Sequence, residues 1–246
     1  MKLSAPVFRL KRRARLLSRT EKIPLNAALD RVAAEEGFSS WSLLAARLPT
    51  LATAATPSAD DAARDLFAAL VPGDLVLVGA RPGQGKTLMS LRLAVEAMKR
   101  GSRSVFFTLE YTPDDVFDRL RAIGAKTMPS GDLFEIDSSD AVSAGHIMKK
   151  LASAAPRTLA VIDYLQLLDQ KRENPTLMLQ VRALKAFARD RGLILVFISQ
   201  IDRSYDASAK PCPDMDDIRL PNPLDLSLFD RMCFLNGGEM RLPAAR

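Results

Sequence analysis

Short apolar runs alternate with amphipathic segments along most of the chain after residue 61. Six of these runs are continuously apolar or nearly so, which is typical of strands that are buried on both faces. The predicted strands are "DLVLVG" (74–79), "SVFFTLE" (104–110), "LFEI" (133–136), "TLAVID" (158–163), "LILVFIS" (193–199) and "RMCFL" (231–235). Helical spacing predicts helices over 87–100, 113–122, 140–154 and 175–191. Strands that alternate with helices predict a mostly parallel sheet with helices on both faces.

A different pattern precedes this region. Apolar residues recur at helical spacing in three short stretches between Val7 and Leu48, which predicts three short helices. Pro24 can open the second helix and Gly37 can end it. The stretch "LPTLATAATPSADD" that follows is rich in Ala, Thr, Pro and Ser and has no periodic apolar positions, so it is typical of a linker. We therefore predict a basic all-helical module over 1–48, a linker over 49–61 and an α/β domain over 62–246.

The positive charge of the chain is concentrated in the predicted helical module. The chain has 35 Lys and Arg residues, 29 Asp and Glu residues and a net charge of +6. Residues 1 to 22 contain eight of the basic residues and one acidic residue, so the remainder is close to neutral. The basic first helix has three interpretations: it binds a phosphate backbone, it binds an anionic membrane surface, or it is simply solvated.

The chain has no feature of a membrane or secreted protein. No apolar run approaches the roughly 18 residues that a membrane span needs. The basic N-terminus is not followed by an apolar stretch with a small-residue cleavage site, and the two cysteines, Cys212 and Cys233, have no metal-type spacing. We therefore expect a cytoplasmic protein with reduced thiols and no membrane span.

A phosphate-binding loop is predicted between the first strand of the sheet and its helix. The stretch "ARPGQGKT" (80–87) has Walker A spacing, with Ala rather than Gly at the first position. Backbone N–H groups of such a loop and the following helix N-terminus form a concave anion site. Lys86 would supply a point charge to the terminal phosphates, and the Thr87 hydroxyl would bind Mg²⁺. The predicted nucleotide-binding residues are Ala80, Arg81, Pro82, Gly83, Gln84, Gly85, Lys86, Thr87 and Leu88.

Three further polar residues follow predicted strands and should reach the same edge of the sheet. Asp163 ends "LAVID", where a carboxylate can hold Mg²⁺ through water. Glu110 ends "SVFFTLE" and could activate the attacking water. Its alternative role, stabilising the N-terminus of the next helix, is already filled by Thr112 and two aspartates, so catalysis is preferred. Gln200 could contact the γ-phosphate, or could be an ordinary surface-turn residue.

The motifs are more informative together than singly. "PGDLVLVGARPGQGKT", "VFFTLEYTPDDVFDRL", "VIDYLQLLDQ" and "ISQIDRS", in that order, resemble the motor domain of DnaB-like replicative helicases, within the wider RecA-like ATPases. The resemblance covers about residues 70 to 240 and implies a RecA-like P-loop NTPase fold with ATP and Mg²⁺ as ligands. It implies that Lys86 and Thr87 bind nucleotide and metal, that Asp163 is the Walker B acid, that Glu110 activates water and that Gln200 is a sensor.

The resemblance also implies partners. In the family, the loops after the Walker B strand and after the sensor strand hold single-stranded DNA in the channel of a hexamer. Here those loops are "YLQLLDQKRENP" and "IDRSYDASAKPCPDMDDIR", in which basic residues are mixed with several acidic ones. The candidate DNA contacts are Lys171, Arg172, Arg203 and Lys210 in the loops, and Arg12 and Arg13 in the basic helix. Nucleic acid is the preferred ligand of that helix because it agrees with the motor domain.

In the family, each subunit inserts an arginine into the ATP site of its neighbour. This trans-acting arginine has no obvious counterpart in the present sequence. In the family it follows the strand that resembles "RMCFLNGGEMRL", and it can be worth ~10³ or more in turnover. We therefore expect a homo-oligomer, such as a hexameric ring, or a partner chain that supplies the arginine. The alternative is a slow-turnover ATP-dependent switch or adaptor, RecA- or KaiC-like, without helicase activity of its own.

Overall fold

The computed structural model describes residues 4, 7–44, 58–125, 133–169, 173–206, 210, 212–220 and 222–242. The chain divides into two compact units, Met1–Pro57 and Ser58–Arg246, and each unit has its own core. No helix in these ranges is both long and apolar enough to cross a membrane.

The first unit is a small helical module. It contains α1 (Val7–Glu21) and α2 (Leu25–Glu35), and residues 41 to 44 are also helical. Leu10 and Ala14 of α1 are buried against Ala28 and Val32 of α2. These are positions that the helical spacing places on one face of each helix. The rest of the third predicted helix, up to residue 48, lies outside the described residues.

The second unit is built on a seven-stranded sheet with the order β3-β2-β4-β5-β1-β6-β7. Neighbouring strands are parallel except for the last pair, β6 and β7. The strands are β1 (Leu75–Ala80), β2 (Ser104–Thr108), β3 (Phe134–Asp137), β4 (Leu159–Asp163), β5 (Ile194–Gln200), β6 (Arg231–Asn236) and β7 (Glu239–Arg241). The predicted mostly parallel sheet is confirmed, and all six predicted strands are present.

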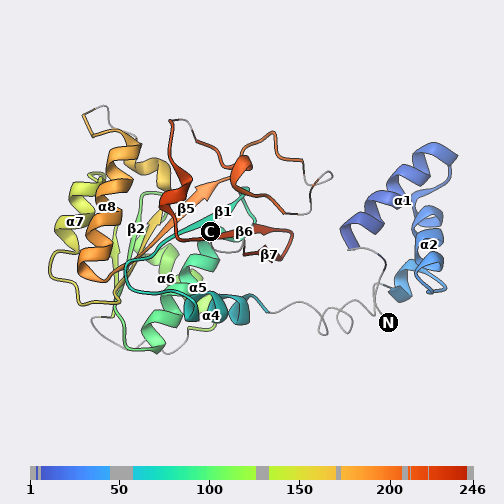
Figure 1. Ribbon diagram of the computed structural model, residues 1–246. Helices are drawn as coiled ribbons and strands as arrows, with labels where there is room; N and C mark the ends of the chain where they lie inside the picture. The colour runs from blue at the N-terminus through green and yellow to red at the C-terminus, as the bar shows by residue number, and fades with distance from the viewer. Residues whose placement is uncertain are drawn as a thin grey trace. The chain divides into compact units, whose positions relative to one another are not determined.

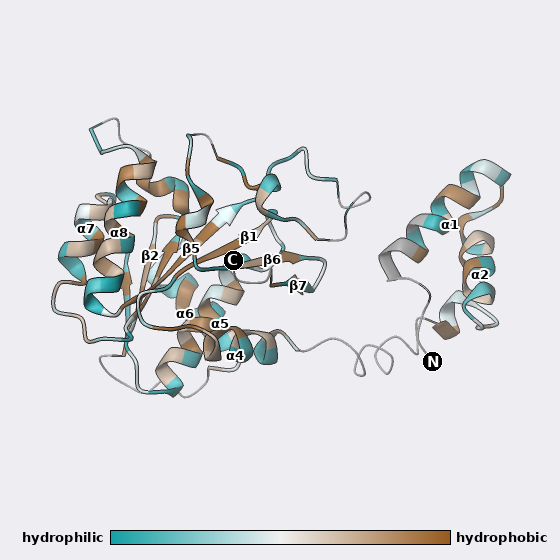
Figure 2. Cartoon of the chain, viewed as in Figure 1, coloured by the Kyte–Doolittle hydropathy of each residue, from teal (hydrophilic) through white to brown (hydrophobic). Residues whose placement is uncertain are grey.

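Helices cover both faces of the sheet (Figure 1). One face packs against α4 (Ala59–Ala68), α5 (Lys86–Lys99) and α6 (Pro113–Ala122), and the other against α7 (Ala144–Lys150) and α8 (Leu177–Arg191). Short 3-10 helices are η1 (Leu165–Asp169), η2 (Met215–Asp217) and η3 (Leu226–Leu228). Successive residues of β1 alternate between the two cores, as the period of a strand requires. The strands are accordingly among the most apolar segments in Figure 2.

Several boundaries differ from the sequence prediction. Helix α4 begins at Ala59, inside the predicted linker, because the Ser58 hydroxyl caps it by accepting a hydrogen bond from the Asp61 N–H at 3.0 Å. Strand β2 ends at Thr108 rather than at Glu110. Helix α7 begins only at Ala144, because the Ser143 hydroxyl caps it. The predicted linker residues 49 to 57 lie outside the described part of the chain.

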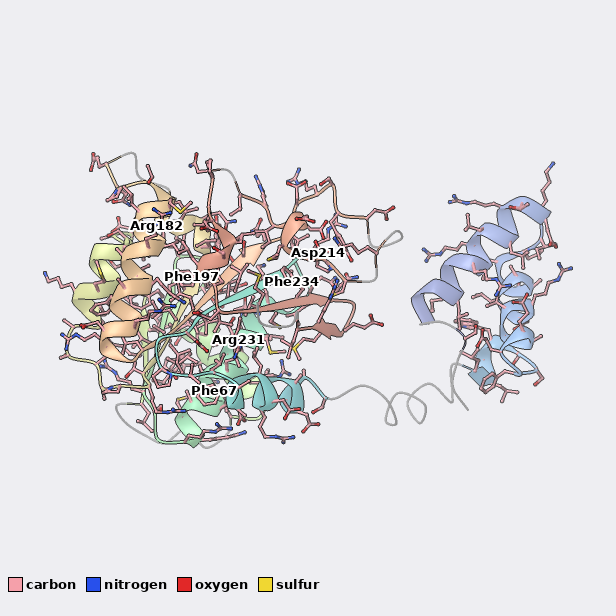
Figure 3. All side chains as sticks on the ribbon, in the orientation of Figure 1. Phe67, Arg182, Phe197, Asp214, Arg231 and Phe234 are labelled. Atoms are coloured by element: carbon pink, nitrogen blue, oxygen red, sulfur yellow. The ribbon has the colours of Figure 1, made fainter. Side chains whose placement is uncertain are left out.

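The Phe234 ring of β6 lies so close over Gly79 of β1 that glycine is required at this position. A Cβ built on Gly79 would lie 2.9 Å from two ring carbons of Phe234 and 3.3 Å from a methyl carbon of Ile201. Phe234 is fully buried in β6 (Figure 3), so its ring has little room to move. The missing side chain of Gly79 therefore leaves room for the Phe234 ring one residue before β1 ends.

Candidate active site

The phosphate-binding loop joins the end of β1, at Ala80, to the start of α5, at Lys86. Gly83 and Gly85 have φ values of 75° and 87°, in the left-handed region that favours glycine. A Cβ at either position would meet no atom within 4 Å. Backbone conformation rather than crowding thus selects glycine here, and the space beside both residues is open to a ligand.

Two of the predicted site residues are joined directly. The Thr87 hydroxyl donates a hydrogen bond to Asp163 Oδ2 at 3.3 Å, which links α5 to the end of β4. Asp163 is fully buried, and Lys86 and Thr87 are buried with it. Asp163 pairs with Thr108 of β2 on one side and Ile198 of β5 on the other. The strand order therefore brings the predicted metal ligand to the start of the phosphate-loop helix.

The pKa of Asp163 is raised to about 7, first by burial and then by the negative charge of Glu110. Lys86, the hydrogen bond from Thr87, and Arg119 act in the opposite direction. These effects are appreciable only between groups that are close in space. Glu110 and the Lys86 ammonium therefore both lie near the Asp163 carboxylate, which ends β4.

The chemistry around Asp163 fits a magnesium ion. Its Oδ1 atom is buried and has no hydrogen-bond partner among the described residues, and such a group is costly unless a ligand satisfies it. Mg²⁺ prefers oxygen ligands and is usually bound by one or two carboxylates together with substrate phosphates. An orphaned carboxylate oxygen beside a threonine hydroxyl meets that requirement.

The raised pKa of Asp163 predicts a specific dependence of stability on pH. Without Mg²⁺, the folded chain should lose stability as pH rises from about 4 to about 7, because Asp163 ionises more easily when unfolded. The Asp163→Asn substitution removes this ionisation. Urea denaturation in EDTA gives the free energy of unfolding of the variant minus that of the wild type. We expect this difference to be higher at pH 8 than at pH 5. An equal difference at the two pH values would contradict the assignment.

Glu110 and Gln200 lie at the ends of strands that flank this centre. Glu110 is exposed and is held in a turn beyond β2, where its backbone N–H donates to the Thr108 hydroxyl at 3.1 Å. Gln200 is the last residue of β5 and pairs with Ala80, where the phosphate loop begins. Its carbonyl accepts a hydrogen bond from the Arg219 N–H at 2.8 Å. The backbone of Gln200 is thus hydrogen-bonded to the end of the predicted loop that follows the sensor strand.

Two contacts at the site were not predicted from the sequence. The Arg119 guanidinium of α6 lies 4.2 Å from the centre of the Tyr111 ring and also acts on the pKa of Asp163. The side chain of Gln84 accepts a hydrogen bond from the Gly237 N–H in the β6–β7 turn at 2.6 Å. No sequence pattern indicates the contact of Gln84 with Gly237. For Arg119, the one available signal is its position on the helix that follows Glu110.

The candidate DNA contacts are dispersed. Lys171 and Arg172 lie outside the described residues, and of Arg12 only the backbone, within α1, is described. Arg203 is exposed in a turn after β5. The other two form ion pairs: Lys210 with Asp214 and Asp217, both at 2.6 Å, and Arg13 with Glu35 at 2.7 Å. Lys210 and Arg13 would have to share or leave these partners in order to bind a phosphate.

A cavity of about 440 Å³ lies elsewhere, along the second half of α5 and beside α4 and the end of α6. Its charged residues neutralise one another, since Arg92 pairs with Asp60 at 2.6 Å and Lys99 with Glu96 at 2.7 Å. None of the predicted nucleotide-binding residues lines it. The cavity is therefore separate from the phosphate loop.

The comparisons with known proteins agree with the geometry. The chain is 26% identical over 187 residues to the replicative DNA helicase DnaB of Leifsonia xyli subsp. xyli (strain CTCB07), covering 63% of this chain and 41% of the helicase. It is 29% identical over 178 residues to the DnaB helicase of Geobacillus stearothermophilus, covering 59% and 39%. The chain thus spans about two fifths of the length of the curated relatives it matches.

Solved structures share the fold. One of them, described as an ATPase domain, superposes with a TM-score of 0.56 at 20% identity, covering 78% of this chain and 81% of that one. A DnaB-like replicative helicase, described with its interactions with primase, superposes with a TM-score of 0.56 at 17% identity. The match covers 92% of this chain and 64% of that one. These likenesses confirm the RecA-like fold and, with the sequence matches, the predicted resemblance to DnaB-like ATPase domains.

The family model described as the KaiC ATPase matches residues 65 to 212. This range is more than half of the chain, and it includes the phosphate loop, Glu110, Asp163 and Gln200. The chain belongs to the KaiC family of ATPases.

Proposed function

We propose that this chain is a Mg²⁺-dependent ATP hydrolase of the DnaB helicase type that acts on single-stranded DNA. One observation carries the proposal: Thr87 and Asp163 are hydrogen-bonded beside an open phosphate loop, with Lys86 and Glu110 both close enough to act on the pKa of Asp163. A phosphate binder without hydrolysis has no need for a second carboxylate at this edge.

Each residue has a distinct role in the proposed reaction. Backbone N–H groups of the phosphate loop and the Lys86 ammonium bind the β- and γ-phosphates. Thr87 and Asp163 would hold Mg²⁺, which neutralises charge on the phosphates when bound. The Glu110 carboxylate orients the attacking water and accepts its proton. Gln200, at the end of the strand beside β1, contacts the terminal phosphate through its side-chain amide and links it to the following loop.

The action on DNA rests on the relatives, whose name is replicative DNA helicase, and on the exposed Arg203 beyond β5. Assembly into a homo-oligomer such as a hexameric ring, or with a partner chain, would supply the arginine that completes the site in trans. A chain that binds ATP but turns it over slowly would instead serve as a switch or adaptor.

Turnover of ATP with and without an oligothymidine strand, in Mg²⁺ and in EDTA, tests the proposal. We expect turnover that requires Mg²⁺ and rises when the strand is added. Light scattering with ATP bound would report whether a ring-sized species forms. If the chain bound nucleotide but did not hydrolyse it, with or without DNA and at any protein concentration, the motor function would be contradicted. The switch or adaptor function would then remain.

A further inference from the structure

Three basic residues form a row along one side of α1. Lys11, Arg15 and Arg19 are spaced four residues apart, so they lie on one side of the helix and rise by about 6 Å from each to the next. All three side chains are exposed. Within the described part of the chain, no ion pair joins any of them to an acidic residue.

The acidic residues of the module are engaged elsewhere. The four carboxylates between residues 7 and 44 are Glu21, Asp30, Glu35 and Glu36. Glu21 pairs with Arg31, and Glu35 pairs with Arg13 at 2.7 Å. Asp30 accepts a hydrogen bond from the Trp41 N–H at 2.8 Å, and Glu36 accepts one from the Ser4 N–H at 2.7 Å. The acidic residues of the module therefore do not neutralise the row on α1.

The spacing of the row indicates a linear ligand. The first and last cations are separated by about 12 Å along the helix, so a single phosphate cannot contact all three. A strand of nucleic acid presents regularly spaced negative charges, and its affinity for a protein grows with the number of cations that contact it. The row is complementary to such a strand in both charge and shape.

The packing of α1 argues against a membrane surface. A helix that lies on a membrane inserts its apolar face among the lipids. The apolar face of α1 is already covered, since Leu10 and Ala14 are buried against α2 and Leu17 packs on the same cluster. The exposed Leu16, with 53% of its surface accessible, is the large apolar residue of α1 left outside that cluster among those described.

We propose that Lys11, Arg15 and Arg19 form a docking row for the phosphate backbone of a DNA strand, separate from the ATPase unit. The row binds without regard to base sequence, because exposed Lys and Arg side chains on phosphates carry no sequence information. It would hold the chain on DNA in the absence of nucleotide. This contact lies outside the ATPase unit and does not depend on ATP hydrolysis.

Salt dependence of DNA binding tests the row. The full chain is titrated with a fluorescent oligothymidine of about 20 nucleotides, without nucleotide, over a range of NaCl concentrations. The test variant is Lys11→Gln/Arg15→Gln/Arg19→Gln, in which glutamine keeps the helix propensity. We expect weaker binding, and a slope of log affinity against log salt that is smaller by about 2, because each phosphate contact contributes ~0.7 on a single strand.

A second triple variant removes the same charge from the other unit. Arg64→Gln/Arg121→Gln/Arg157→Gln changes three exposed arginines of the ATPase unit and should leave affinity and slope near wild type. Trp41, the sole tryptophan of the chain, packs against the core of the module, so its fluorescence reports whether the row variant still folds. If the two triple variants lost DNA affinity equally, with Trp41 fluorescence unchanged, the proposed docking row would be wrong.

Two other measurements separate the alternatives. Loss of binding to phosphatidylserine vesicles in the row variant, with DNA affinity unchanged, would overturn the proposal in favour of a membrane ligand. Turnover of ATP without DNA should be equal in wild type and in the row variant. A chain that never hydrolyses ATP but loses DNA affinity in the row variant would refute the proposed function and support the row.

Discussion

Glu110→Gln is expected to reduce ATP turnover by about 10²- to 10⁴-fold, the range typical of a lost general base. Glutamine keeps the shape of the side chain but cannot accept a proton from water. ATP binding should persist, because the phosphate loop and Lys86 are unchanged. Steady-state turnover gives the loss, and titration with a fluorescent ATP analogue gives the retained affinity.

Asp114→Asn is the matched control for this prediction. Asp114 is exposed in the first turn of α6, four residues after Glu110, and its substitution removes the same charge. Turnover of this variant should stay within a few-fold of wild type. Glu110→Gln also removes a charge that raises the pKa of Asp163, so the pKa of Asp163 should fall. A Glu110→Gln variant as active as Asp114→Asn would show that the proton is accepted elsewhere.

Lys86→Ala is expected to weaken ATP binding by about 10- to 100-fold, which corresponds to the loss of a charge-assisted hydrogen bond worth ~1.5 to 3 kcal/mol. Lys86 opens α5 and is only 8% exposed. Within the described residues no carboxylate lies within 4 Å of its ammonium, so its charge is available to phosphates. Calorimetric titration with ATP and Mg²⁺ measures the change in affinity.

Lys99→Ala provides the comparison at the other end of the same helix. Lys99 is exposed and pairs with Glu96, and its loss should leave ATP affinity unchanged. Lys86→Ala should also abolish turnover at ATP concentrations that saturate the wild type. If both variants bind ATP equally well, the phosphates are not held by Lys86 and the phosphate-loop assignment is wrong.

The sequence predicted those parts of the fold that are determined by local pattern. Buried parallel strands are continuous apolar runs, and this is why the six long strands were found. Strand β7 has three half-exposed or exposed residues, too few to form a pattern. Helix α4 was missed because its start lies within a Ser- and Ala-rich stretch, although the spacing of Leu66, Phe67 and Leu70 is helical.

Only those parts of the site that belong to recognisable motifs in a known order could be predicted from the sequence. Lys86, Thr87 and Asp163 were placed together because carboxyl ends of parallel strands share one edge, and the hydrogen bond between Thr87 and Asp163 agrees with that expectation. The contact of Gln84 with Gly237 joins residues 153 positions apart. It depends on where the last strands join the sheet, and no local pattern encodes strand order.

The contact between Gly79 and the Phe234 ring places a constraint on nucleotide binding outside the phosphate-loop motif. Gly79 precedes the phosphate loop, and even one added methyl group there would press on the Phe234 ring. Relief would have to come from β6 or from β1 itself, and movement of β1 displaces the loop that begins at its end. Residues 79 and 234 should therefore vary together among homologues: a larger residue at 79 would be tolerated only where 234 is smaller.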